Sequence, residues 1–268
     1  MSGLCMFSGL ATAVPSLADQ YHKKLDTLLS SYVRKEPGIG LQGRTFSRRS
    51  IKYQQLHASP GWEEYISSLA YVSEPVLKAA SDDARKAFWL NTFNILVIES
   101  VGKAVPPLEE APRSDPLFWK APHNVAGKAY TLEQIRETLY SFGDPRVVFA
   151  MTEASVGSPS LPEKAFTATN INRQLDEAVR NAASDPSFVR LVRGQNTLYL
   201  AEIFQLEAAV FSSPIWPTST QFNTYLPPAR AIIALAAPYL TEPERKFLAG
   251  GKVQVKYMPS ANTLNNAR

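Results

Sequence analysis

The sequence predicts an α+β fold in one domain, with N-terminal helices and a buried central helix against a small, largely antiparallel sheet. Of the 268 residues, 45% are hydrophobic, which suffices for a sizeable core and excludes wholesale disorder. Twenty prolines divide the chain into short elements rather than a long bundle. No repeat, low-complexity tract or break in composition marks a linker, so we predict a single domain over residues 19–268 rather than two small ones.

The first 18 residues leave two interpretations open. Residues 4–14 are apolar or small, and Ser16-Leu17-Ala18 resembles a signal-peptidase cleavage site, but a positively charged n-region is missing. Residues 1–18 are therefore either the remainder of a secretory signal, which makes the protein periplasmic or secreted, or a segment of a cytoplasmic protein. Cys5 is the one cysteine of the chain, which excludes an intramolecular disulfide and a cysteine-rich metal site. No other segment approaches the ~20 apolar residues of a membrane span, so no transmembrane segment is expected.

Hydrophobic periodicity predicts the elements of the first half. Apolar residues at helical spacing predict a helix over 19–33, and an extended segment is expected over 46–53 after a glycine-rich loop. Ser59-Pro60 is expected to open a second helix, with proline at its first position. The strongest prediction is a helix over 82–102, which is apolar on nearly all sides and therefore buried.

Capping signals and short apolar runs predict the second half. Residues 104–124 are proline-rich and irregular, and 155–162 is a loop of small residues. The run 147–151 is continuously apolar, which indicates a buried strand. The other expected elements are a helix opened by a Thr131–Gln134 capping box, a helix through Leu175 and Val179, strands over 188–192 and 197–201, a helix opened by a Thr241–Glu244 capping box, and a strand over 252–257.

Charge and histidine content exclude several function classes. The net charge of +4 is small, and the densest basic stretch comprises Arg44, Arg48, Arg49 and Lys52 without a nucleic-acid-binding motif. We interpret that stretch as a solvated surface strand, with phosphate binding as the alternative, and expect no nucleic-acid partner. The glycine-rich stretch 38–43 has neither the spacing of a Walker loop nor that of a dinucleotide fingerprint. The three histidines include no i, i+4 pair, so we expect no metal and no cofactor.

Several segments in order resemble the domain of unknown function 547 family, of which the chain looks like a divergent member. The matching residues are Phe88–Asn94, Trp119-Lys120 with 125–127, Leu132–Ile135, Arg146–Met151 with Gly157-Ser158-Pro159, and Tyr257, Leu264 and Asn265. The resemblance covers residues from about 20 to 266. A papain-like or transglutaminase-like core is suggested for some bacterial members of this family. The resemblance would therefore imply such a core, and thiol hydrolase activity, for this chain.

The chain departs from the family at the positions that such chemistry needs. The family's cysteine falls on Ser158, its glutamate–histidine pair on Arg136 and Glu137, and its histidine on Val148. A thiol nucleophile needs a cysteine and a nearby base, so thiol catalysis at this site is excluded. The resemblance then implies a pseudoenzyme, whose cleft is derived from a hydrolase-like site.

Two groups of polar residues are candidates for this cleft. Asn91 and Asn94 lie three residues apart and share one helix face, so they either line a pocket or pin the loop 104–124 to the core. Ser158 follows the expected buried strand, in a loop of small residues. It is either a turn serine or a nucleophile that needs His57 or His123 as a base.

Carboxylates give the remaining candidates. Glu137, Glu153 and Glu163 could form an acid–base pair or bind a hard metal, but their spacing matches neither site. The alternative is surface charge or a salt bridge to Arg136 or Arg146.

The sequence thus favours a non-catalytic binding protein. Its ligand, which is a small molecule, a peptide or a protein partner, is expected between the helix of the two asparagines and the segment 146–158. The ligand-binding residues would be Asn91, Asn94, Arg146, Glu153 and Ser158. The alternative is a hydrolase that uses Ser158 or a pair of carboxylates.

Overall fold

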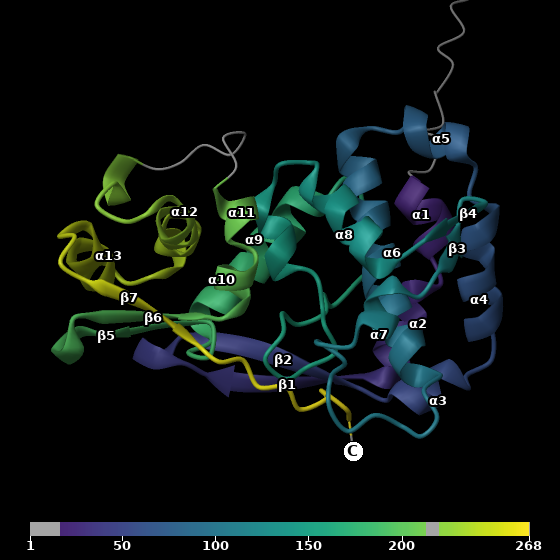
Figure 1. Cartoon of the computed structure of the whole chain (residues 1–268), viewed down its shortest axis with the longest axis horizontal. Helices are drawn as coiled ribbons and strands as arrows, with labels where there is room; N and C mark the ends of the chain where they lie inside the picture. The colour runs from purple at the N-terminus through teal and green to yellow at the C-terminus, as the bar shows by residue number, and fades with distance from the viewer. Residues whose placement is uncertain (1–16, 213–219, 268) are drawn as a thin grey trace, which may run out of the picture.

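The computed structural model describes residues 17–212 and 220–267, and the helix α6 (Asp82–Gly102) lies at the centre of its N-terminal half (Figure 1). The Ser81 hydroxyl accepts a hydrogen bond from the Ala84 N–H at 3.2 Å and caps this helix. Most of its side chains are buried, and it contacts α1 (Leu17–His22), α3 (Tyr53–His57) and α8 (Leu132–Tyr140). The predicted buried central helix is confirmed, and its main neighbours are helices.

The other N-terminal helices are α2 (Leu25–Tyr32), α4 (Trp62–Ser68), α5 (Glu74–Ala79) and α7 (Pro116–Lys120). The helix expected over 19–33 is two helices, because the chain turns at Lys23-Lys24 and Val33 already begins a strand. The helix expected from Ser59-Pro60 begins only at Trp62, because Gly61 has a φ of 80° and cannot continue a right-handed helix. The segment 104–124 holds α7, which Asp115 caps through the Leu117 N–H.

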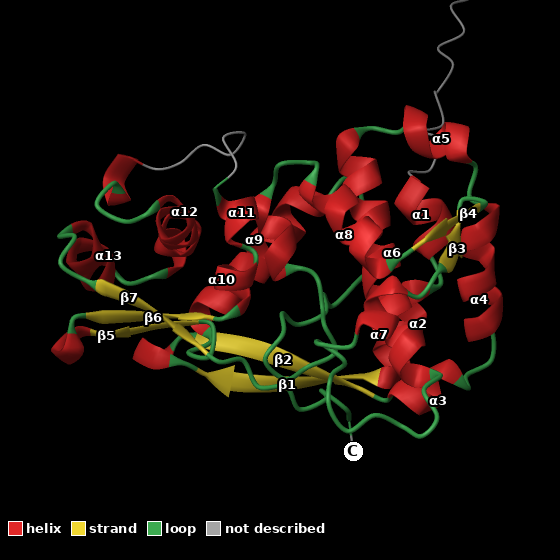
Figure 2. Cartoon of the chain, viewed as in Figure 1, coloured by secondary structure: helices red, strands yellow, loops and turns green. Residues whose placement is uncertain are grey.

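Three small sheets replace one continuous sheet (Figure 2). The strands β1 (Val33–Ile39) and β2 (Thr45–Ile51) form an antiparallel hairpin, as do β3 (His123–Val125) and β4 (Lys128–Tyr130). The third sheet has the order β5–β6–β7 (Val189–Val192, Thr197–Ala201, Gln254–Met258), in which β6 pairs antiparallel with β5 and parallel with β7. The α+β class and the largely antiparallel pairing are confirmed.

The strand expected over 147–151 is wrong. Residues Pro145–Phe149 form a 3₁₀ helix, which the Asp144 carboxylate caps by accepting from the Arg146 N–H at 3.1 Å. The Asn94 side chain then bonds to Ala150 and Thr152, so the backbone there is satisfied without a neighbouring strand. A short apolar run shows that a segment is buried, but it does not distinguish a strand from a buried turn of helix.

The C-terminal half comprises α9 (Ile171–Ser184), α10 (Ile203–Leu206), α11 (Ala208–Phe211), α12 (Pro227–Ala236) and α13 (Glu242–Ala249). Further 3₁₀ turns span Leu41–Gly43, Leu69–Tyr71, Arg193–Gln195, Thr220–Phe222 and Ala237–Tyr239. Both predicted capping boxes, Thr131 with Gln134 and Thr241 with Glu244, are present. The threonine accepts from the third backbone N–H of the helix while the longer side chain accepts from the threonine N–H.

Two clusters of buried apolar side chains fill the molecule. One surrounds α6, and the other lies between the β5–β6–β7 sheet and the helices α9 to α13; the side chains of Tyr140 and Ala178 contact both. Figure 1 shows α9 between the two halves, with the β1–β2 hairpin running along one side of it. Over the described ranges, no helix combines the length and apolarity that a membrane crossing requires. Most of the segment 1–18, where the signal remnant is predicted, lies outside the described residues.

Candidate functional site

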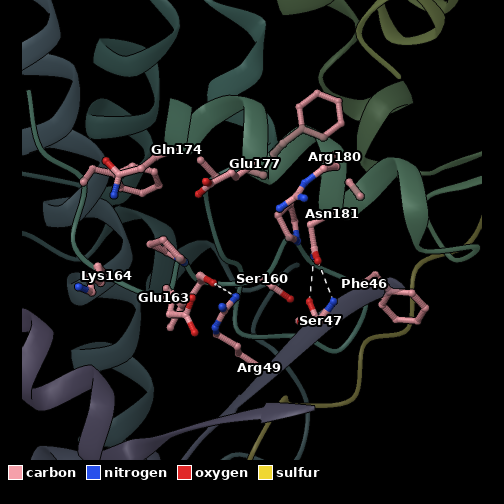
Figure 3. A pocket seen from close by; sticks show the side chains of 18 of the residues that line it. Phe46, Ser47, Arg49, Ser160, Glu163, Lys164, Gln174, Glu177, Arg180 and Asn181 are labelled. Carbon is pink, nitrogen blue, oxygen red and sulfur yellow. Dashed lines mark hydrogen bonds between the residues drawn. The ribbon is translucent and has the colours of Figure 1, made fainter. Parts of the chain in front are cut away.

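A cleft of about 710 Å³ lies between β2, α9 and the segment 159–167, and we call it the α9–β2 cleft (Figure 3). Apolar side chains line part of it, among them Phe149, Phe166 and Phe188. Hydroxyl and amide side chains from β2, α9 and the intervening loop supply hydrogen-bonding groups. The cleft therefore combines apolar surface with a limited set of polar groups, as ligand sites do.

The Asn181 side chain fixes α9 against β2. Its amide nitrogen donates to the Ser47 carbonyl at 2.9 Å, and its amide oxygen accepts from the Ser47 N–H at 2.7 Å (Figure 3). A second link is the Arg48 guanidinium, which makes two hydrogen bonds of 2.8 Å to the Asp185 carboxylate at the end of α9. These paired contacts hold two walls of the cleft in one geometry.

Side chains from both walls and from α6 hold the third wall. The Asn91 amide bonds to the N–H and the carbonyl of Phe166 at 2.8 and 2.9 Å. The Gln174 side chain reaches the Ala165 carbonyl and the Thr167 N–H at 2.9 and 3.0 Å. The Arg49 guanidinium donates to the Leu161 carbonyl at 2.6 Å. The loop 159–167 is thus anchored along its length although it has no regular secondary structure.

Basic side chains outnumber acidic ones in the cleft lining. The basic residues are Lys35, Arg49, Lys164, Arg173 and Arg180, and the acidic ones are Asp26, Glu163 and Glu177. Each acid has a partner within the protein: Glu163 pairs with Lys35 at 3.4 Å, Glu177 pairs with Arg173 at 2.6 Å, and Asp26 accepts from the Ala165 N–H at 2.6 Å.

Three cations of the lining are left without a carboxylate partner within 4.0 Å among residues 17–212 and 220–267: Arg49, Lys164 and Arg180. Figure 3 shows the Arg180 side chain extending from α9 and the Arg49 side chain from β2 into the space between these elements. Burial lowers the pKa of Arg49, and the nearby Glu163 opposes this shift, but a guanidinium stays charged at neutral pH. The cleft therefore presents positive charge that the protein itself does not neutralise.

The five residues predicted to bind a ligand do not line this cleft. Asn91 lies behind it, 1% exposed, and supports Phe166. Asn94, 3% exposed, donates to the Ala150 carbonyl at 3.0 Å and accepts from the Thr152 N–H at 2.9 Å. The alternative that these amides pin the loop 104–124 is wrong, because their partners lie in 150–166.

Arg146 and Glu153 belong to two separate charge networks. Arg146 bonds to Asp144 and Asp176 at 2.8 and 2.7 Å. Burial by itself would lower the pKa of Arg146, but the bonds to these carboxylates raise it above its usual value. Glu153 forms salt bridges with Arg113 and Arg136 at 3.3 and 3.2 Å. A salt bridge to Arg136 is one of the alternatives that the sequence leaves open for this carboxylate.

The other candidate carboxylates are apart from Glu153. Glu137 is exposed on α8, and Glu163 lies at the α9–β2 cleft. The Arg136 guanidinium lies over the Trp119 ring at 4.5 Å and reaches Glu207 at 3.5 Å. Over the described residues, no group of three or more His, Cys, Asp or Glu side chains is arranged to hold a metal ion.

Ser158 is 6% exposed and lines a separate pocket of about 100 Å³, which shares Arg49 and Ser160 with the α9–β2 cleft. Its hydroxyl donates to the Ser155 carbonyl at 2.8 Å, and the Thr152 hydroxyl lies 3.5 Å away. No histidine or carboxylate of the described chain is hydrogen-bonded to this hydroxyl.

Neither histidine named as a possible base is hydrogen-bonded to Ser158. The Nδ1 atom of His57 lies 2.9 Å from the Glu99 carboxylate. His123 is buried on β3. The geometry at Ser158 is that of a turn serine, although ligand binding by this residue stays a prediction.

Sequence reasoning missed Lys164, Gln174, Arg180 and Asn181 as residues of the candidate site. Gln174 and Asn181 repeat at helical spacing on the polar side of an amphipathic helix, which looks like an ordinary solvent-exposed face. Arg49 belonged to the basic stretch whose alternative interpretation was phosphate binding. The sequence therefore contained one signal for the positive charge on β2, but no signal that α9 forms the opposite wall of the cleft.

Comparison with known families gives one match. A family described as "Protein of unknown function, DUF547" matches residues 77–181, which run from α5 through α6 to most of α9. This match confirms the resemblance for the motifs between Phe88 and Pro159. The resemblance at Tyr257, Leu264 and Asn265 lies outside the matched residues and stays an expectation. No curated protein and no solved structure matches the chain, so the papain-like or transglutaminase-like core stays an expectation.

Proposed function

We propose that this chain, which matches the DUF547 family over residues 77–181, is a binding protein that holds an anionic ligand in the α9–β2 cleft. One observation carries the proposal: Arg49, Lys164 and Arg180 line one cleft, and no carboxylate of the described residues lies within salt-bridge distance of them. A carboxylate or phosphate of a ligand would supply the missing partner. A guanidinium binds either group through two parallel hydrogen bonds.

The size and lining of the cleft support a ligand larger than a single ion. Its volume of about 710 Å³ falls within the ~300–1,000 Å³ range of sites for small organic ligands. Apolar residues also line the cleft beside the charges, among them the half-buried Phe46. The ligand class is therefore an organic anion or an acidic peptide.

The hydrogen bonds of Ser158 favour binding over hydrolysis. A serine nucleophile needs a base within about 2.6–3.2 Å of its hydroxyl. The Ser158 hydroxyl instead donates to the Ser155 carbonyl. The hydrolase alternative predicts turnover that Ser158→Ala abolishes, whereas the binding proposal predicts that this variant binds the ligand as tightly as the wild type.

Isothermal titration with capped hexaglutamate at low salt tests the proposal. We expect Arg180→Gln and Lys164→Ala each to weaken binding by roughly tenfold, because a hydrogen bond to a charged group is worth about 1.5 kcal/mol or more. Lys252→Ala is the matched control, since Lys252 is exposed but does not line the cleft. An equal effect of all three substitutions would contradict the proposal, and so would a folded wild type that binds neither hexaglutamate nor a small organic polycarboxylate such as citrate.

A further inference from the structure

We infer that the anionic ligand is an extended peptide with acidic side chains, which adds a strand to the outer edge of β2. The inference rests on the proposed function and goes further by naming the ligand class and its mode of binding. It depends on the direction in which the backbone groups of β2 point, on which of them lack a partner, and on the charge that surrounds them.

The register of the β1–β2 hairpin determines which backbone groups face the cleft. In an antiparallel pair, alternate residues direct both backbone groups toward the neighbouring strand or away from it. The N–H and carbonyl of Ser47 point away from β1, because both bond to the Asn181 side chain on α9. Thr45, Arg49 and Ile51 share this orientation, because the register runs without a break from Ile39↔Thr45 to Val33↔Ile51.

One end of this edge already binds an extended segment. The C-terminal segment of the chain forms a parallel bridge with β2 at Ile51. The Ile51 N–H donates to the Asn265 carbonyl at 2.9 Å, and the Ala267 N–H donates to the Ile51 carbonyl at 3.0 Å. The outer edge of β2 is therefore competent to pair with extended backbone.

The rest of the edge is open or held by a side chain. Among the described residues, the Thr45 N–H and carbonyl and the Arg49 N–H have no hydrogen-bond partner, and both residues line the cleft. Between them, the Ser47 groups are occupied by the Asn181 amide, which has the donor and acceptor of one peptide group. A bound peptide would pair with Thr45 and Arg49 and would replace the Asn181 amide at Ser47. Because an added strand lies about 4.8 Å from its neighbour, α9 would have to move away from β2 when the peptide binds.

The charges around this edge select an acidic sequence. Side chains of an added strand point alternately to its two faces, so they meet different walls of the cleft. Arg49 extends from the strand itself, and Arg180 extends from the opposite wall (Figure 3). Lys164 lies on the third wall, so cations without a carboxylate partner surround the edge on several sides. Carboxylate side chains of the peptide are complementary to all three.

Backbone methylation of the probe tests the inference. Capped hexaglutamate is compared with the same peptide methylated on its two central backbone nitrogens, which keeps every charge but removes one donor from each edge of the strand. We expect the methylated peptide to bind at least roughly tenfold more weakly, because backbone hydrogen bonds supply affinity in strand addition. Citrate, which has carboxylates but no peptide backbone, is the third probe.

Each outcome decides between the two claims. Equal binding of both peptides would overturn strand addition while leaving anion binding intact, and failure of all three probes to bind would overturn the proposed function as well. A protein-side measurement accompanies the titrations: hydrogen exchange of the Thr45 and Arg49 amides should slow when hexaglutamate binds. Asn181→Ala should bind hexaglutamate more tightly, since the side chain that occupies Ser47 is gone; weaker binding by the folded variant would contradict the replacement at Ser47.

Discussion

His22 is a buried histidine whose Nδ1 atom lies 2.6 Å from the Tyr65 hydroxyl. Burial lowers its pKa from 6.5 to about 3, so the folded protein keeps this side chain neutral under conditions in which the unfolded chain binds a proton. His123 on β3 behaves in the same way, because burial, and then the nearby Lys103, lower its pKa to about 4. Both residues couple the stability of the N-terminal core to pH.

Acid therefore destabilises the protein through His22. Its contribution is complete above pH 6.5 and declines as the pH falls toward about 3, because in that window the unfolded state binds more protons than the folded state. The slope is at most about 1.4 kcal/mol per pH unit for one proton. Urea unfolding between pH 7 and pH 4 measures it, and His22→Phe should reduce the slope; an unchanged slope in a folded variant would refute this account.

At the scale of single residues, local signals were predictable and distant partners were not. The residues of both capping boxes lie three positions apart, so spacing alone predicted their contacts. Asn91 and Asn94 were recognised as amides that need partners, but those partners lie 56 to 75 residues away along the chain. Only the folded chain brings α6 to the segment 150–166.

Among the structural elements, α6 organises its surroundings through these two amides. The Asn94 side chain satisfies one carbonyl and one N–H in the buried stretch 150–152, where no strand neighbour is present. This contact also explains why the apolar run 147–151 need not be a strand. The hydrophobic pattern of a segment indicates that it is buried. Which groups its backbone N–H and carbonyl bond to depends on the tertiary structure.

Asn94→Ala is expected to lower the free energy of unfolding by about 2–6 kcal/mol, because two buried backbone groups lose their partners at ~1–3 kcal/mol each. Denaturant titration measures the change. The control is Asn223→Ala, an exposed asparagine, for which we expect a change within about 0.5 kcal/mol. Equal effects of the two substitutions would show that the amide of Asn94 does not hold this segment.

Over the whole molecule, the β1–β2 hairpin connects the two apolar clusters by salt bridges to the C-terminal half. Arg48 pairs with Asp185, and Arg44 pairs with Glu244 on α13 at 2.6 Å. The Asp185 side chain is only 2% exposed. Hydrogen bonding to Asp185 raises the pKa of Arg48 above its usual value, although burial opposes the shift.

Arg48→Ala should destabilise the protein by about 2–3 kcal/mol, because it leaves the Asp185 carboxylate buried without its cation. This value is below the ~3–5 kcal/mol of a fully buried pair, since the Arg48 side chain is 37% exposed and Asp185 keeps its bonds to Ser187. A double-mutant cycle with Asp185→Asn measures the coupling by urea unfolding. Additive effects of the two substitutions would contradict this role of the pair.

The architecture was more predictable than the site. Periodicity identified α6, α9 and the strands of the third sheet, because each has a local pattern of side chains. The α9–β2 cleft has no such pattern, since its walls come from residues 26–49, 149–167 and 170–188, which only tertiary packing brings together. The family motifs directed attention to Ser158, next to this cleft, but not to its positive charges.

The location of the bound anion tests the central claim most directly. Backbone amide chemical shifts of the ¹⁵N-labelled protein are recorded while capped hexaglutamate is added. We expect the largest changes in β2, in the segment 159–167 and in α9, which form the walls of the cleft. Changes confined to another surface, such as the groove around Arg190 and Pro259, or no changes at all, would contradict an anion-binding function for the α9–β2 cleft.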